Sequence, residues 1–249
     1  MAGFVLVAGA FHGAWCWERV VPLLEARGHV VNAVELPGMG ADRTPFAQLS
    51  FEDWVDAVVA AVDAAPHPVI LVGHSRAGHV VSAVGERVPQ AIDLAVYLAA
   101  VLLPGGASLA DGAGLFADRG APTPPMAPCE DGLSSRLDGP EIGALFYHMA
   151  TPDWRDRALA LLGPEPHFSF ATPVALSEAR FGQVRRAYVE CLQDRTVPLP
   201  VQRAMQRSWP CGIVAAIESD HSPFYCVPEA LAELFDGLAA RAGARGAAG

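Results

Sequence analysis

A serine stands among small residues in Gly73-His74-Ser75-Arg76-Ala77, directly after the apolar residues 69–72. This pentapeptide differs from the G-x-S-x-G nucleophile elbow at one place, because Ala77 replaces the final glycine. An elbow holds its serine on a strained turn between a buried strand and a helix, where bulky neighbours would collide with the backbone. Ser75 is therefore the candidate nucleophile. The alternative is a serine that only caps the following helix.

A nucleophilic serine needs a base within hydrogen-bond reach and an acid that fixes the tautomer of that base. Asp194 follows the strand expected over residues 186–191, and His221 follows the strand expected over residues 212–217. Open α/β sheets bind ligands at the carboxyl ends of their strands, and elbow sites order their residues as Ser, Asp, His. We therefore expect Ser75, Asp194 and His221 to meet at one edge of a sheet. A turn aspartate and an ordinary loop histidine are the alternatives.

Nearby polar residues compete for these roles. Asp220 adjoins His221 in the sequence and is a poor partner for orienting that ring, so we expect it to accept hydrogen bonds within its own loop. His74 occupies the variable position of the elbow and is expected to be a packing residue. His12, in the first loop, is a candidate for a supporting role behind the reacting groups.

Two backbone N–H groups stabilise the developing oxyanion in this kind of site. One belongs to the residue after the nucleophile, here Arg76, and the other to the loop after the first strand, here Ala10. Gly9 and Ala10 suit that loop because it must be tight and its residues small.

Strands and helices alternate along most of the chain, which predicts an α/β fold with a mostly parallel sheet and helices on both faces. One domain is expected over residues 1–249, because α/β folds of this length often form a single unit. A glycine- and alanine-rich tail from Gly243 is expected to be frayed. Strands are expected over 4–7, 29–34, 69–72, 94–98, 186–191 and 212–217. Helices are expected over 15–27, 51–64, 200–209, 228–241 and from the elbow to about 88.

Residues 104–184 interrupt this alternation with a segment rich in Gly, Pro and Asp. Helical patterns over 140–149 and 154–162 occur in it, and no strong strand does. An insertion of this length in an α/β chain is more often a lid over the active face than a separate domain. Side chains of the first loop and of this lid are candidates for substrate contact, with core packing as the alternative: Phe11, Phe146, Tyr147 and His148.

The composition excludes several classes of protein. Apolar residues make up 52% of the 249 and charged ones 18%, which is enough for a large core. The net charge of −10 and the absence of any basic cluster argue against a nucleic-acid partner. Apolar runs are too short to span a membrane, and the first residues lack a basic leader, so we expect a cytoplasmic protein. Five scattered cysteines without a C-x-x-C pair predict reduced thiols and no metal site.

Four segments carry a specific resemblance: residues 4–15, 73–75, 188–198 and 220–224. Through them the chain resembles, over nearly its whole length, the α/β-hydrolase family of plant salicylate-type methyl esterases, hydroxynitrile lyases and related bacterial esterases. The likeness implies an α/β-hydrolase fold and a mostly apolar pocket under the lid for a small acyl or aryl ester. It also implies a triad of Ser75, Asp194 and His221, with Ala10 and Arg76 as oxyanion donors.

Two departures from the family bear on the reaction. The family usually has His-Gly where this chain has Ala8-Gly9, so a side chain that helps to brace the oxyanion loop is missing. The lyases carry threonine in place of Gly9 and lysine in place of Ser222, and this chain has no lysine, which disfavours cyanohydrin cleavage.

The sequence thus predicts a cofactor-independent carboxylic ester hydrolase that cleaves a small methyl or aryl ester through an acyl-enzyme. A non-hydrolytic cyclisation or C–C lyase step with the same triad is the first alternative. A catalytically silent hydrolase fold that binds a ligand is the second. The expected partner is a small molecule, and a homodimer stays open.

Overall fold

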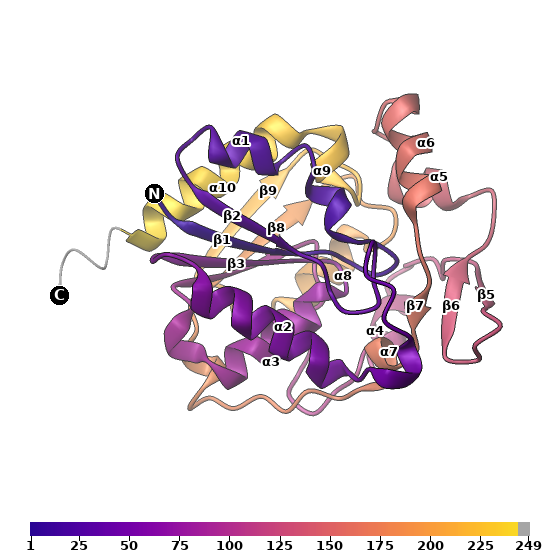
Figure 1. Ribbon diagram of the computed structural model, residues 1–249, viewed down its shortest axis with the longest axis horizontal. Helices are drawn as coiled ribbons and strands as arrows, with labels where there is room; N and C mark the ends of the chain where they lie inside the picture. The colour runs from indigo at the N-terminus through magenta and orange to yellow at the C-terminus, as the bar shows by residue number, and fades with distance from the viewer. Residues whose placement is uncertain (244–249) are drawn as a thin grey trace.

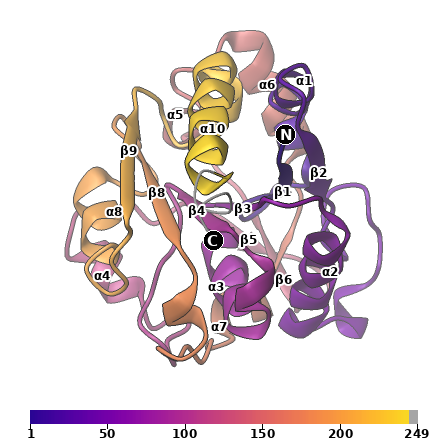
Figure 2. The same cartoon turned by 90° about the vertical axis from the view of Figure 1, so that its left-hand side faces the viewer.

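The central sheet of the computed structural model has six strands, all parallel, in the order β2-β1-β3-β4-β8-β9. The structure describes residues 1–243, and the tail expected to be frayed lies, apart from Gly243, beyond them. Figure 2 looks along the sheet from one end, with β2 and β9 at its two edges. The predicted α/β class with a mostly parallel sheet is confirmed. The strands are β1 Gly3–Val7, β2 Val30–Val34, β3 Val69–His74, β4 Leu94–Leu98, β8 Arg186–Cys191 and β9 Ile213–Ile217.

Helices cover both faces of this sheet, because alternate strand residues point to opposite sides. In β1, Phe4 and Leu6 belong to the core beneath α1 and α10, whereas Val5 and Val7 belong to the core beneath α2 and α3. Figure 1 shows the two pairs of helices on opposite sides of the strands. No helix within residues 1–243 is both long and apolar enough to cross a bilayer. The main helices are α1 Val21–Glu25, α2 Phe51–Ala64, α3 Ala77–Arg87, α8 Leu199–Met205, α9 Pro223–Cys226 and α10 Pro228–Gly243.

Most of the segment between β4 and β8, residues 104–184, lies beyond the carboxyl ends of the strands, and its last residues return along α3 to the start of β8 (Figure 1). No strong strand is expected in this segment, and the structure shows only a small antiparallel sheet in the order β5-β6-β7. These strands are only two to four residues long, too short for an alternating pattern to show in the sequence. Its elements are α4 Ala113–Ala117, β5 Met126–Pro128, β6 Ser134–Leu137, α5 Ile142–Phe146, α6 Pro152–Leu161, β7 Glu165–Pro166 and α7 Phe168–Ala171.

Close packing at the start of α3 fixes the turn that follows β3. A Cβ on Gly78 would collide with the backbone oxygen of Val101, in the chain just beyond β4. A Cβ on Gly73 would lie 2.6 Å from Cγ2 of Val81. The helix can therefore approach the strands closely only because these two positions are glycine.

We predict that Gly78→Ala destabilises the protein by about 1–3 kcal/mol, because the added methyl group has no space and the colliding atom is backbone. Gly237→Ala is the matched control, since Gly237 lies in α10 and an added Cβ meets no atom within 4 Å among residues 1–243. This control should stabilise the helix by up to about 1 kcal/mol. Urea unfolding of both variants measures the difference, and equal shifts for the two would contradict the packing argument.

Candidate active site

Ser75 lies on the turn between β3 and α3 with a left-handed backbone, φ +52°. Few residues other than glycine adopt this conformation, so it is held by its surroundings. The Ser75 N–H donates to the Leu98 carbonyl at 3.2 Å, and the Val101 N–H donates to the Ser75 carbonyl at 2.9 Å. The end of β4 and the chain just beyond it thus hold the turn through both the N–H and the carbonyl of Ser75.

Three strand ends bring the predicted reactive side chains together. Ser75 Oγ lies 3.0 Å from Nε2 of His221, and Nδ1 of the same ring lies 2.7 Å from Oδ2 of Asp194. The side chains of His221 and Asp194 are at most 1% exposed. The structure therefore assembles the expected set at the carboxyl ends of β3, β8 and β9.

The surroundings of Asp194 fix the tautomer of His221. Oδ1 of Asp194 accepts from the backbone N–H groups of Thr196 and Val197, each at 2.8 Å. An ionised carboxylate only accepts hydrogen bonds, so the proton of the neutral imidazole lies on Nδ1 and the lone pair on Nε2 faces Ser75. The ring is ready to accept a proton from the serine hydroxyl.

His74 and Asp220 support this arrangement from the flanking positions. His74 Nε2 lies 2.7 Å from the backbone carbonyl of His221, and burial lowers the pKa of His74 well below its usual value. A neutral His74 thus donates to the loop that carries the candidate base. Asp220 accepts from the N–H groups of Met149 and Ser222 at 2.7 and 2.9 Å, so it ties its own loop to the segment after α5.

The loop after β1 carries the first expected oxyanion donor, and the carbonyls of Gly9, Ala10 and Phe11 in it all have partners. Nη2 of Arg76 donates to the Gly9 carbonyl at 3.1 Å, Nδ1 of His12 lies 2.6 Å from the Ala10 carbonyl, and the Gly163 N–H donates to the Phe11 carbonyl at 2.9 Å. Within residues 1–243, the N–H groups of Ala10 and Arg76 meet no protein acceptor. Both are available to an oxygen placed above Ser75.

His12 links this loop to the segment between β4 and β8. It is 1% exposed, and its Nε2 lies 2.5 Å from the hydroxyl of Tyr147. Burial lowers the pKa of His12 to about 4, so the ring is neutral at pH 7. With the ring proton on Nδ1 facing the Ala10 carbonyl, Nε2 accepts from Tyr147.

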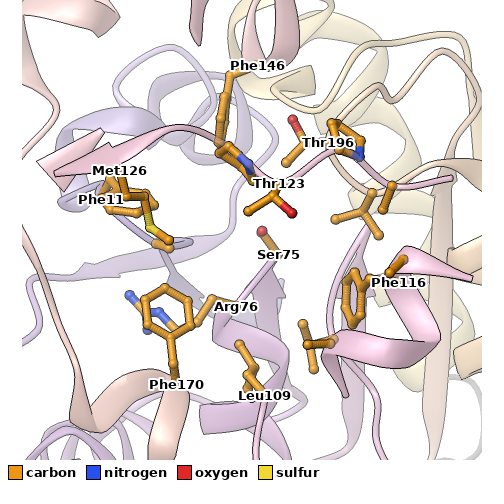
Figure 3. Close-up of a pocket in the computed structure, with 18 residues that line it drawn as sticks. Phe11, Ser75, Arg76, Leu109, Phe116, Thr123, Met126, Phe146, Phe170 and Thr196 are labelled. Carbon is orange, nitrogen blue, oxygen red and sulfur yellow. The ribbon is translucent and has the colours of Figure 1, made fainter. Parts of the chain in front are cut away.

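A cavity of about 260 Å³ opens above Ser75 (Figure 3). Of the four candidates for substrate contact, Phe11 and Phe146 line this cavity, whereas Tyr147 and His148 do not. Instead, the fully buried Tyr147 turns its hydroxyl to His12, and His148 lies outside the cavity. Most of the remaining wall comes from the segment between β4 and β8. Part of it is the short α4, which the sequence does not predict because no periodic pattern marks it. Its wall residues are Leu109, Ala113, Phe116, Ala117, Ala121, Pro122, Thr123, Pro124, Met126 and Phe170.

Sequence reasoning also missed Glu165 in β7, which is fully buried beside the loop after β1. A glutamate between two prolines reads as an exposed loop residue, and only its tertiary contacts reveal the role. Oε2 of Glu165 accepts from the Phe11 N–H at 2.8 Å, and Oε1 lies 2.9 Å from Nε of Arg76.

The fold and the site define a class of protein: the chain belongs to the alpha/beta hydrolase family, whose model matches residues 4–234. Among curated proteins it is 32% identical to Methylesterase 1 of Arabidopsis thaliana, over 93% of this chain and 94% of that one. It is also 32% identical to Salicylic acid-binding protein 2 of Nicotiana tabacum, over 92% and 93%. Among solved structures, a mutant of polyneuridine aldehyde esterase superposes with a TM-score of 0.83 at 26% identity, over 95% of this chain and 98% of that one. The resemblance inferred from the sequence is confirmed.

The low pKa of His12 makes the folded state sensitive to acid. The folded pKa of about 4 lies below the ordinary value of 6.5, so the unfolded chain binds the proton first as the pH falls. The stability from this group is complete above pH 6.5 and is lost as the pH falls toward 4. We predict a loss of roughly 2 kcal/mol between pH 8 and pH 5 that His12→Asn does not show. Urea unfolding at each pH tests this, and parallel curves for the two proteins would contradict it.

Proposed function

We propose that this protein is a serine hydrolase that cleaves small carboxylic esters through an acyl-enzyme. The observation that carries the proposal is the continuous contact from Asp194 through His221 to Ser75, at 2.7 and 3.0 Å, beneath an apolar cavity. The membership of the alpha/beta hydrolase family and the esterase names of the relatives support it.

In the acylation step, Ser75 Oγ attacks the ester carbonyl carbon while its proton moves to Nε2 of His221. The carbonyl oxygen becomes an oxyanion, which the N–H groups of Ala10 and Arg76 stabilise. Asp194 holds the ring in place and stabilises the imidazolium that forms. When the tetrahedral intermediate collapses, the ester C–O bond breaks and His221 returns its proton to the leaving alcohol.

In the deacylation step, a water molecule replaces the alcohol. His221 takes one proton from the water as the water oxygen attacks the acyl carbon. The same two N–H groups donate to the oxyanion that forms. Collapse of the second intermediate breaks the bond to Oγ, and the imidazolium returns the proton to Ser75. The net change is one ester and one water to one acid and one alcohol.

The cavity favours an uncharged, apolar acyl group. Arg76 is the only charged residue among the eighteen that line it, and its side chain is 2% exposed and paired with Glu165. Thr123 and Thr196 are the polar side chains besides Ser75. A charged acyl group would lose its hydration there without gaining a partner. The methyl and aryl esters expected from the sequence match this wall.

The five cysteines are free thiols, which suits a reducing compartment. This supports the cytoplasm as the place where the protein acts on its small-molecule ester.

We predict that Ser75→Ala lowers the kcat for p-nitrophenyl butyrate by at least about 10³-fold, because the attacking group is gone. Ser82→Ala is the matched control, since that buried hydroxyl donates to the Gly78 carbonyl, contacts the Tyr97 hydroxyl of β4 and does not line the cavity. It should keep nearly full activity. A fluorophosphonate should label the parent and the control but not Ser75→Ala. A parent that is not labelled would mean a silent binding protein, and products whose summed mass does not exceed that of the substrate by 18 Da would mean a non-hydrolytic reaction.

A second prediction concerns the acyl group. Each methylene buried in the cavity contributes about 0.8 kcal/mol, so kcat/KM should rise about fourfold per methylene from the p-nitrophenyl acetate until the cavity is full. The p-nitrophenyl hemisuccinate, which carries a carboxylate, should be at least about tenfold slower than the butyrate. Initial rates over this series measure both effects. A flat series, or a preference for the hemisuccinate, would contradict an apolar acyl site.

A further inference from the structure

Glu165 contacts the two chain segments that carry the expected oxyanion donors. Its Oε2 accepts from the N–H of Phe11, the residue after Ala10, at 2.8 Å. Its Oε1 lies 2.9 Å from Nε of Arg76, although that N–H is not aimed at the oxygen, so this contact is an ion pair. Each carboxylate oxygen therefore holds a different segment.

The guanidinium of Arg76 returns to the same loop. Nη2 donates to the Gly9 carbonyl at 3.1 Å, and Cζ lies 4.4 Å above the ring of Trp54 in α2. The side chain is thus held between a carboxylate, a carbonyl and an indole face, where a cation is favoured. From Gly9 through Arg76 and Glu165 to Phe11, the contacts form a closed ring around Ala10.

The loop needs this support because it is strained. Phe11 has a left-handed backbone at φ +68°, which is costly for a residue with a side chain. No side chain fits at Gly9, since a Cβ there would lie 2.8 Å from Nδ1 of His74 and 3.0 Å from Cβ of Ser75. Rotation of the loop would move the Ala10 N–H away from the oxyanion.

From this geometry we propose that Glu165 is a positioning residue, whose carboxylate orients the Ala10 and Arg76 N–H groups toward the oxyanion. The inference rests on the proposed function and assigns to Glu165 a part in the rate of that same reaction. Glu165 does not line the cavity and acts through Phe11 and Arg76. The other role for such an ion pair is to anchor the segment between β4 and β8, without any effect on the rate.

Three variants separate these two roles. Glu165→Gln keeps the shape and an acceptor for Phe11 but removes the charge that holds Arg76. Arg76→Met with Glu165→Gln removes both charges and retains the Arg76 backbone N–H. Glu86→Gln is the matched control, because Glu86 also anchors the segment, at Ser177 and Phe181, away from the oxyanion loop.

The measurements are Tm, the kcat and KM for p-nitrophenyl butyrate per labelled serine, and inhibition by an aliphatic trifluoromethyl ketone. The ketone adds to the serine and forms an oxyanion, so its affinity reports on the donors. For Glu165→Gln we expect kcat to fall about 10- to 100-fold with KM within about threefold, because misplaced donors cost rate rather than binding. The Ki of the ketone should rise by a similar factor, whereas Glu86→Gln should change neither.

The double variant decides between positioning and anchoring. Loss of both charges leaves no unpaired buried ion, so its Tm should exceed that of Glu165→Gln. If Glu165 positions the donors, the kcat of the double variant stays at least about tenfold below that of the parent. The Ki of the ketone then also stays high, even where the Tm recovers. Recovery of kcat together with Tm, or a normal kcat in Glu165→Gln, would overturn the proposal. If Glu165→Gln does not fold, the kcat of the double variant alone gives the answer. A parent without labelling or turnover would instead overturn the proposed function.

Discussion

The left-handed backbone of Ser75 is the constraint on which the rest of the site depends. A serine in this conformation is stable only where the chain on both sides is already fixed, and here β3, α3 and the backbone beyond β4 fix it. Gly73 and Gly78 permit the close approach that this requires. The close packing of α3 on the sheet thus holds this one residue in its strained conformation.

The parallel sheet then explains why distant residues meet. All six strands end at the same edge, so loops after β3, β8 and β9 converge although Ser75, Asp194 and His221 are far apart in the sequence. The loop after β1 joins them because β1 and β3 are neighbours. Buried hydrogen bonds set the tautomers of the histidines at this edge. Burial lowers the pKa of His12 and of His74, so both of these rings are neutral.

Residues that follow a strong strand could be predicted, and residues that act through tertiary contacts could not. Ser75, Asp194 and His221 stand within four residues of the ends of predicted strands, and they follow the order Ser, Asp, His of elbow sites. Tyr147 was expected at the cavity but points to His12, because a tyrosine in a short helical segment has no pattern that reveals the direction of its hydroxyl. The sequence does not reveal Glu165 for a related reason: the residue that pairs with its buried carboxylate, Arg76, lies far away in the sequence.

The segment between β4 and β8 has a division of labour along its length. Residues 109–126 supply much of the cavity wall, to which Phe146 and Phe170 add, whereas Gly163 and Glu165 hold the loop after β1. Much of the wall and the support of that loop therefore come from different stretches of one insertion. An exchange of residues 109–126 would reshape the cavity while Gly163 and Glu165 stay in place, whereas a graft that replaces the whole insertion would discard that support as well.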